Sequence, residues 1–143
     1  MTNTGEAVKT YTDLFTALKD AGSQCDYLIT LGLQKNPAGS IKTDINRISG
    51  CKTAIWINVE CTKKLIHFTS ESDSLLVCGI LAIYEVLYNG KSPEDISGNP
   101  PEFLESISDE VIYPEIKQNG LLKCYKKLCA FQKINHNAKG EYV

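Results

Sequence analysis

Cysteine is the residue type in this chain that offers the widest choice of chemistry. A thiolate can attack a sulfur atom, bind a metal or be oxidised. Of the six cysteines, Cys51 stands apart because it follows Gly50 and lies between two β-prone stretches. Glycine permits unusual backbone angles, so we expect Cys51 at or near an exposed turn, where its thiol is accessible and Lys52 beside it favours the thiolate. A surface cysteine without a function fits the same spacing.

The other cysteines are explained by the apolar faces on which they fall. Cys25, Cys78 and Cys124 share helix faces with leucine or isoleucine, and Cys61 ends the apolar face of a strand. Cys129 lies about 140° around the helix from Cys124 and has no obvious partner. We interpret these thiols as small hydrophobic core side chains, which are chemically inert when buried.

Metal binding is the competing use of cysteine. Successive cysteines are separated by 26, 10, 17, 46 and 5 residues, so there is no C-x-x-C pair, and neither His67 nor His136 has a second ligand at helical spacing. Dinucleotide, P-loop and G-x-S-x-G motifs are absent. The adjacent acids Glu94 and Asp95 fit a helix N-terminus better than a catalytic pair. We therefore expect no resident metal or cofactor.

Composition and charge exclude several classes of function. The formal net charge of −2, with 43% hydrophobic and 22% charged residues, indicates a globular protein without the basic excess that nucleic-acid binding requires. The longest uncharged apolar run, residues 75–84, is shorter than the roughly 20 residues that span a bilayer. Residues 1–12 contain no signal-peptide core. We expect one cytoplasmic domain over residues 1–143 with free thiols, no membrane contact and a polar, flexible tail at 135–143.

The elements that must position Cys51 follow from the spacing of apolar residues. Helical periods occur before Cys51, alternating apolar and polar residues follow it, and helical periods then return. This order predicts an α+β fold, in which a small antiparallel sheet of two or three strands packs against helices. The expected helices are 7–18, 24–33, 75–87 with an N-cap at Ser72-Asp73, two short ones after Ser92 and Pro101, and 119–131; the expected strands are 52–61 and 65–69, joined by a hairpin at Lys63-Lys64.

The segment around Cys51, G-C-K-T-A-I-W at residues 50–56, resembles the G-C-x-S-x-V-W motif of the SufE family of sulfur acceptors. Later segments match that family in the same order, namely residues 72–82, 88–96 and 119–121, so that the resemblance covers roughly residues 10 to 132. Three positions depart from the family pattern. Thr53 replaces serine, Cys78 replaces lysine, and Lys117 replaces arginine and thereby loses a planar, bidentate donor.

The resemblance implies a SufE/IscU-like fold and a role in iron-sulfur cluster assembly. A SufE-like protein accepts persulfide sulfur from a SufS-type cysteine desulfurase, stimulates that enzyme, and passes the sulfur to a SufBCD-type scaffold. Pyridoxal phosphate belongs to the desulfurase, and the acceptor needs no cofactor. The resemblance makes Cys51 the acceptor thiol in a monomer or weak homodimer; residues implied to support its loop or to contact the partner are Gly50, Thr53, Asp73 and Lys117.

A persulfide loses its sulfur to stray thiols, so a carrier benefits from shielding its cysteine. We expect Ile48 and Ile55 to shelter Cys51 until a partner docks. Two other classes remain open. An IscU-like cluster scaffold would need several converging ligands, and a thiol redox enzyme using Cys51 would need a resolving thiol nearby. The residues leave open whether transfer counts as independent enzymatic turnover.

Overall fold

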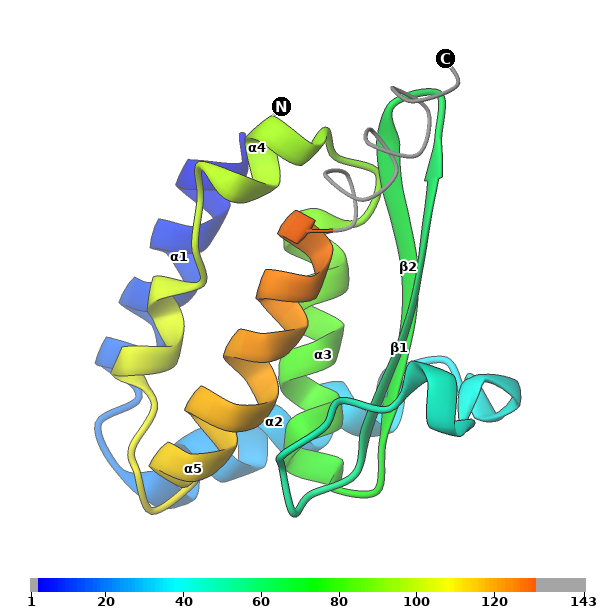
Figure 1. Ribbon diagram of the computed structural model, residues 1–143. Coiled ribbons are helices and arrows are strands. Elements are labelled where there is room, and N and C mark those ends of the chain that lie inside the picture. Colours follow the sequence, from blue (N-terminus) through cyan, green and yellow to red (C-terminus); the bar gives the residue numbers. More distant parts are fainter. Residues whose placement is uncertain (1–2, 131–143) are drawn as a thin grey trace.

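The computed structural model describes residues 3–130, so the expected tail at 135–143 lies outside the described residues. A β-hairpin lies on one side of the molecule and the helices lie on the other (Figure 1). The strands are β1 (Ile55–Thr62) and β2 (Leu65–Ser72), and the helices are α1 (Thr4–Ala17), α2 (Ala21–Gln34), α3 (Leu75–Tyr88), α4 (Pro93–Ser97) and α5 (Pro114–Ile116). The α5 helix continues through a π-helical turn, Lys117–Leu121, into a helix over residues 122–130. Short 3₁₀ turns occupy Gly39–Ile41, Asp44–Asn46 and Glu102–Ser106.

The sheet is the predicted antiparallel hairpin, and the α+β class is confirmed. It has two strands, paired from Ile55↔Ser72 to Thr62↔Leu65. Lys63 and Lys64 form the connection with φ values of 53° and 66°, the positive angles that a two-residue hairpin turn requires. Ile55 and Ile57 on β1 are buried, as the alternation predicts. The strand begins three residues later than predicted because residues 51–54 turn away from the sheet.

The first two helices begin earlier than their apolar periods indicate because polar side chains cap them. Asn3 and Glu6 form a reciprocal capping box that starts α1 at Thr4. The side chain of Asp20 accepts a hydrogen bond from the Ser23 backbone N–H and starts α2 at Ala21. Both helices therefore gain a turn or nearly a turn.

Helix α3 is buried along most of its length between the sheet and the other helices. Its close contact with α2 depends on Gly79, where a Cβ atom would lie 2.2 Å from the Leu28 carbonyl oxygen. The predicted N-cap at Ser72-Asp73 is wrong, because Ser74 caps the helix by accepting from the Val77 N–H. The Ser72 hydroxyl instead donates to the Ala54 carbonyl at 2.7 Å and so ties the end of β2 to the segment before β1.

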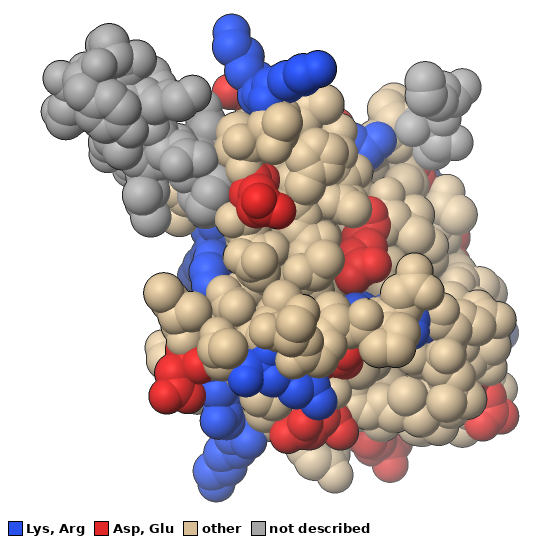
Figure 2. Space-filling model, turned by 90° about the vertical axis from the view of Figure 1, so that its right-hand side faces the viewer, with Lys and Arg blue, Asp and Glu red and all other residues tan. Residues whose placement is uncertain are grey.

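The surface carries charges of both signs. On the side of the hairpin, Lys and Arg side chains alternate with Asp and Glu across a largely uncharged surface, without a broad field of one sign (Figure 2). Within residues 3–130, no helix has both the length and the apolar character needed to cross a bilayer.

Candidate functional site

Cys51 lies in a loop that returns on itself. We call residues 48–54 the Cys51 loop; the Ile48 N–H donates to the carbonyl of Ile55, the first residue of β1, at 2.8 Å and closes it. Next to this bond, Arg47 pairs with Trp56 as an isolated antiparallel bridge, so the segment before the loop extends the edge of β1. Gly50 has φ +84°, a left-handed conformation that favours glycine. The local turn thus forms where the Gly-Cys pair indicates.

The thiol itself is buried, and the expectation of an exposed Cys51 is wrong. Its residue is only 7% exposed, because the loop folds against the π-helical turn that follows α5 (Figure 1). A Cβ atom at Gly120 would lie 2.9 Å from Cys51 Sγ and 2.9 Å from Ile55 Cδ1. The absence of a side chain at Gly120 therefore leaves the space that the sulfur fills. We call Ile55 and Gly120 the thiol seat.

Of the two residues expected to shelter Cys51, Ile55 lies at the thiol, and the second side of the shelter is formed by Gly120, which the sequence analysis did not predict. Ile55 forms the apolar wall, and Ile48 is buried in the same core cluster as Cys51. Gly120 comes from a part of the chain far from Cys51, so spacing within the motif could not reveal it. The available signal was a glycine inside an otherwise helical pattern, which often marks close packing or function. π-Helical turns have the same association.

Burial is the main influence on the ionisation of Cys51. It raises the pKa of the thiol; the Thr53 backbone N–H opposes this shift, and the Glu115 carboxylate raises the pKa further. The positive charges that lower the pKa belong to Lys123 and Arg47. The expected influence of Lys52 is not found, since this side chain is exposed and the effective charges come from elsewhere. In its seat Cys51 is thus a protonated thiol at neutral pH.

The other predicted site residues, Thr53, Asp73 and Lys117, differ in how they contact the Cys51 loop and the turn that carries Gly120. Thr53 acts through its backbone N–H, as above. Asp73 is exposed, pairs with Lys42 at 3.7 Å, and donates its backbone N–H to the Ala54 carbonyl at 3.3 Å, beside the end of the loop. Lys117 lies at the start of the π-helical turn, where Nζ donates to the Ile107 carbonyl at 2.5 Å and pairs with Asp109 at 3.0 Å. It fixes the turn that carries Gly120.

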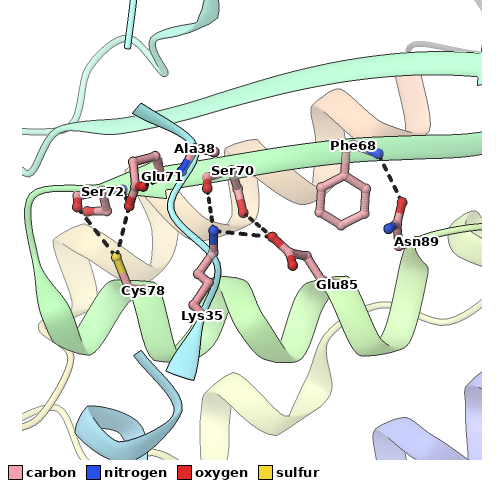
Figure 3. A network of polar contacts seen from close by, with 9 residues as sticks. All are labelled: Lys35, Ala38, Phe68, Ser70, Glu71, Ser72, Cys78, Glu85 and Asn89. Carbon is pink, nitrogen blue, oxygen red and sulfur yellow. Dashed lines mark hydrogen bonds and ion pairs between the residues drawn. The ribbon is translucent and has the colours of Figure 1, made fainter. Parts of the chain in front are cut away.

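All six cysteines are free thiols. Cys78, which stands where the SufE family usually has lysine, lies in a polar network between β2 and α3 (Figure 3). Its Sγ is 3.5 Å from Glu71 Oε1 and 3.4 Å from the Ser72 carbonyl. In the same network, Lys35 donates to the Ser70 carbonyl and pairs with Glu85 at 3.3 Å. Burial raises the pKa of Cys78, which fits its interpretation as an inert structural thiol.

Cys124 is the one surprise among the remaining cysteines. It is fully buried one turn after Gly120, and Cys51 is close enough to influence its ionisation. The positions of the cysteines in the sequence do not indicate that Cys51 and Cys124 lie close together. Burial raises the pKa of Cys124 to about 12, so its thiol stays protonated and is a weak nucleophile. No group of three or more His, Cys, Asp or Glu side chains suited to a metal occurs in the described part of the chain.

The fold and the site together define a small α+β protein with one cysteine held in a glycine-lined seat on a closed loop. Residues 9–131 match the model of the SufE family, the Fe-S metabolism associated domain, and the chain belongs to this family. The resemblance seen in the motifs is thereby confirmed.

Individual relatives are more distant. An uncharacterized SufE-like protein of Synechocystis is 27% identical over 95 residues, covering 64% of this chain and 60% of that protein. A second uncharacterized SufE-like protein, from Rhizobium meliloti, is 31% identical over 91 residues, covering 59% of this chain and 64% of that protein. The chain thus spans less than two thirds of these relatives. The solution structure of a hypothetical protein from Thermus thermophilus has the same fold, with a TM-score of 0.66 and 17% identity over 87% of this chain and 91% of that one.

Proposed function

We propose that this protein accepts sulfur on Cys51 from a SufS-type cysteine desulfurase, stimulates that enzyme, and delivers the sulfur to a SufBCD-type assembly scaffold. It acts in a reducing cytoplasm, where its thiols stay free. It carries no cofactor of its own, and pyridoxal phosphate remains in the desulfurase. Membership of a family associated with Fe-S metabolism supports the pathway.

The transfer is an exchange between sulfur atoms. The Cys51 thiolate attacks the outer sulfur of the desulfurase persulfide and forms a new S–S bond. The old S–S bond breaks, and its electron pair leaves with the desulfurase cysteine as a thiolate. No oxidant or reductant is consumed. The proton that Cys51 loses is taken up by solvent or by the partner.

The observation that carries the proposal is the position of the Cys51 thiol. Cys51 is held against Ile55 and Gly120 rather than displayed to solvent. A protected thiol suits an acceptor that reacts only when its protein partner has docked. A persulfide in the same position would also be screened from stray thiols.

Mass spectrometry after incubation with the desulfurase and cysteine tests the proposal. We expect one or more sulfur atoms on the peptide that contains Cys51, and faster alanine production by the desulfurase. Cys51→Ser should abolish both, whereas Cys61→Ser, which changes a half-buried thiol on the sheet, should abolish neither. Sulfur on other cysteines with none on Cys51 would contradict the assignment.

A further inference from the structure

Lys123 lies where it can hold the Cys51 loop closed. Its Nζ donates a hydrogen bond to the Ser49 carbonyl at 2.8 Å. The same nitrogen would lie 2.6 Å from a Cβ atom at Gly50, so the ammonium group packs directly on the residue before Cys51. A lysine on the last helix thus bridges to the backbone of the loop whose sulfur rests against that helix at Gly120.

The two ends of the turn that carries Gly120 are fixed differently. At its start, Lys117 is bound to the Ile107 carbonyl and Asp109, within the surrounding helices. Beyond its end, Lys123 binds the Cys51 loop. The ends of the Cys51 loop are tied by the bond between Ile48 and Ile55 and by the bonds to the Ala54 carbonyl. Its middle, where Ser49, Gly50 and Lys52 are exposed, is therefore the part that can move when the Lys123 bond breaks.

We propose that Lys123 is a positioning residue for Cys51, which keeps the thiol in its seat through the bond to the Ser49 carbonyl and releases it when an acidic group of a docked partner takes over the ammonium. The bond lies at the surface, because Ser49 and Gly50 are both exposed. A carboxylate on the docking face of the desulfurase can thus reach it. A charged pair replaces a hydrogen bond to a neutral carbonyl, so the exchange favours release.

The charges around the sulfur agree with this assignment. Lys123 lies close enough to Cys51 to lower the pKa of its thiol. The same ammonium therefore favours the thiolate that must form once burial is relieved. The proposed function is needed only for the second part of the inference, release by the desulfurase; loop closure by Lys123 is a property of the free protein.

Hydrogen exchange of the free protein tests loop closure. Lys123→Met removes the donor while keeping an unbranched side chain. Because a hydrogen bond from a charged donor is lost, we expect the Ile48 amide, whose bond to the Ile55 carbonyl closes the loop, to exchange roughly tenfold faster. Lys123→Arg, which keeps the charge and the donors, should restore slow exchange. Lys126→Met is the matched control, since Lys126 is exposed on the same helix. Wild-type exchange in Lys123→Met, or equal acceleration in Lys126→Met, would overturn the inference.

Alkylation of Cys51 tests release by the partner. Rates are measured between pH 6 and 9.5, and the fitted profile separates the thiolate fraction from the limiting rate. An inactive desulfurase should raise the limiting rate of the wild type about tenfold, and that of Lys123→Met, already raised, by less than about twofold. An equal gain in both proteins would overturn release through Lys123. Failure of Cys51 to take up sulfur would refute the proposed function and leave the exchange result standing.

Discussion

Filling the space at Gly120 should expel the Cys51 thiol. In Gly120→Ala the new methyl group lies 2.9 Å from Cys51 Sγ and from Ile55 Cδ1, which is closer than carbon and sulfur tolerate. Overpacking of this kind costs about 1–3 kcal/mol. The Cys51 side chain can avoid that cost by leaving the seat, and it can move because it belongs to a loop. The alanine therefore shifts the loop from closed to open.

The size of the effect follows from that free energy. A penalty of about 1–3 kcal/mol on the closed state alone changes the ratio of open to closed by about 5-fold to 150-fold. Alanine also favours the helix by about 1 kcal/mol over glycine, but the helix is present in both states, so this gain cancels from the ratio. Relative to the unfolded chain, that gain offsets part of the penalty, so the free energy of unfolding should fall by less than the penalty itself.

Iodoacetamide labelling, with the modified peptide identified by mass spectrometry, measures the outcome. Cys51 of Gly120→Ala should react faster by a factor in that range, up to the rate of a free thiol. The midpoint of its pH profile should fall, because leaving the seat removes the burial that raises the pKa. Gly39→Ala is the control, since a Cβ atom there meets nothing within 4 Å. A labelling rate equal to that of the wild type would show that the thiol does not depend on the seat.

Two further predictions concern ionisation. Glu115→Gln removes a charge that raises the pKa of Cys51, so the midpoint of the labelling profile should move to lower pH, more clearly at low salt because Glu115 is exposed; an upward shift would contradict the electrostatics. Burial raises the pKa of Cys124 in the folded protein to about 12, whereas the same thiol in the unfolded chain has a pKa near 8.5. Above pH 8.5 the unfolded chain therefore ionises first, and the free energy of unfolding falls as the pH rises. Chemical denaturation should show the free energy of unfolding falling between pH 7.5 and 9.5, and Cys124→Ala should remove roughly 1 kcal/mol of that fall; an identical fall in both proteins would show that Cys124 titrates normally.

The sequence is most informative about elements whose signals are local. Alternating apolar residues place β1 and its buried face, and the Lys63-Lys64 connection lies where the two strands meet. Boundaries are less accessible because they depend on single capping side chains. Ser74 rather than Ser72 begins α3, since the Ser72 hydroxyl is used by the Ala54 carbonyl, a partner visible only once the hairpin has formed.

In the candidate site, too, the sequence predicts the local turn but not the contacts made by distant residues. Gly50 and Cys51 correctly indicate a turn, but a turn is exposed only if nothing packs on it. Here the last helix does, and it does so because Gly120 has no side chain and Lys123 reaches back to Ser49. Both residues are distant in sequence and of ordinary type. Proximity of this kind follows from the path of the whole chain, which a motif does not encode.

Burial of Cys51 also bears on the choice among thiol chemistries. A peroxidase-type cysteine must meet small oxidants as a thiolate, which requires exposure and a depressed pKa. Cys51 has the opposite properties, and Cys124, whose pKa Cys51 influences, is held protonated by burial. A buried thiol still serves an acceptor if docking supplies the free energy that opens the loop. That free energy is of the order of one charge-assisted hydrogen bond, about 1.5–3 kcal/mol, which a modest protein interface provides. The reaction is then confined to the complex, where the incoming sulfur has one thiol to meet.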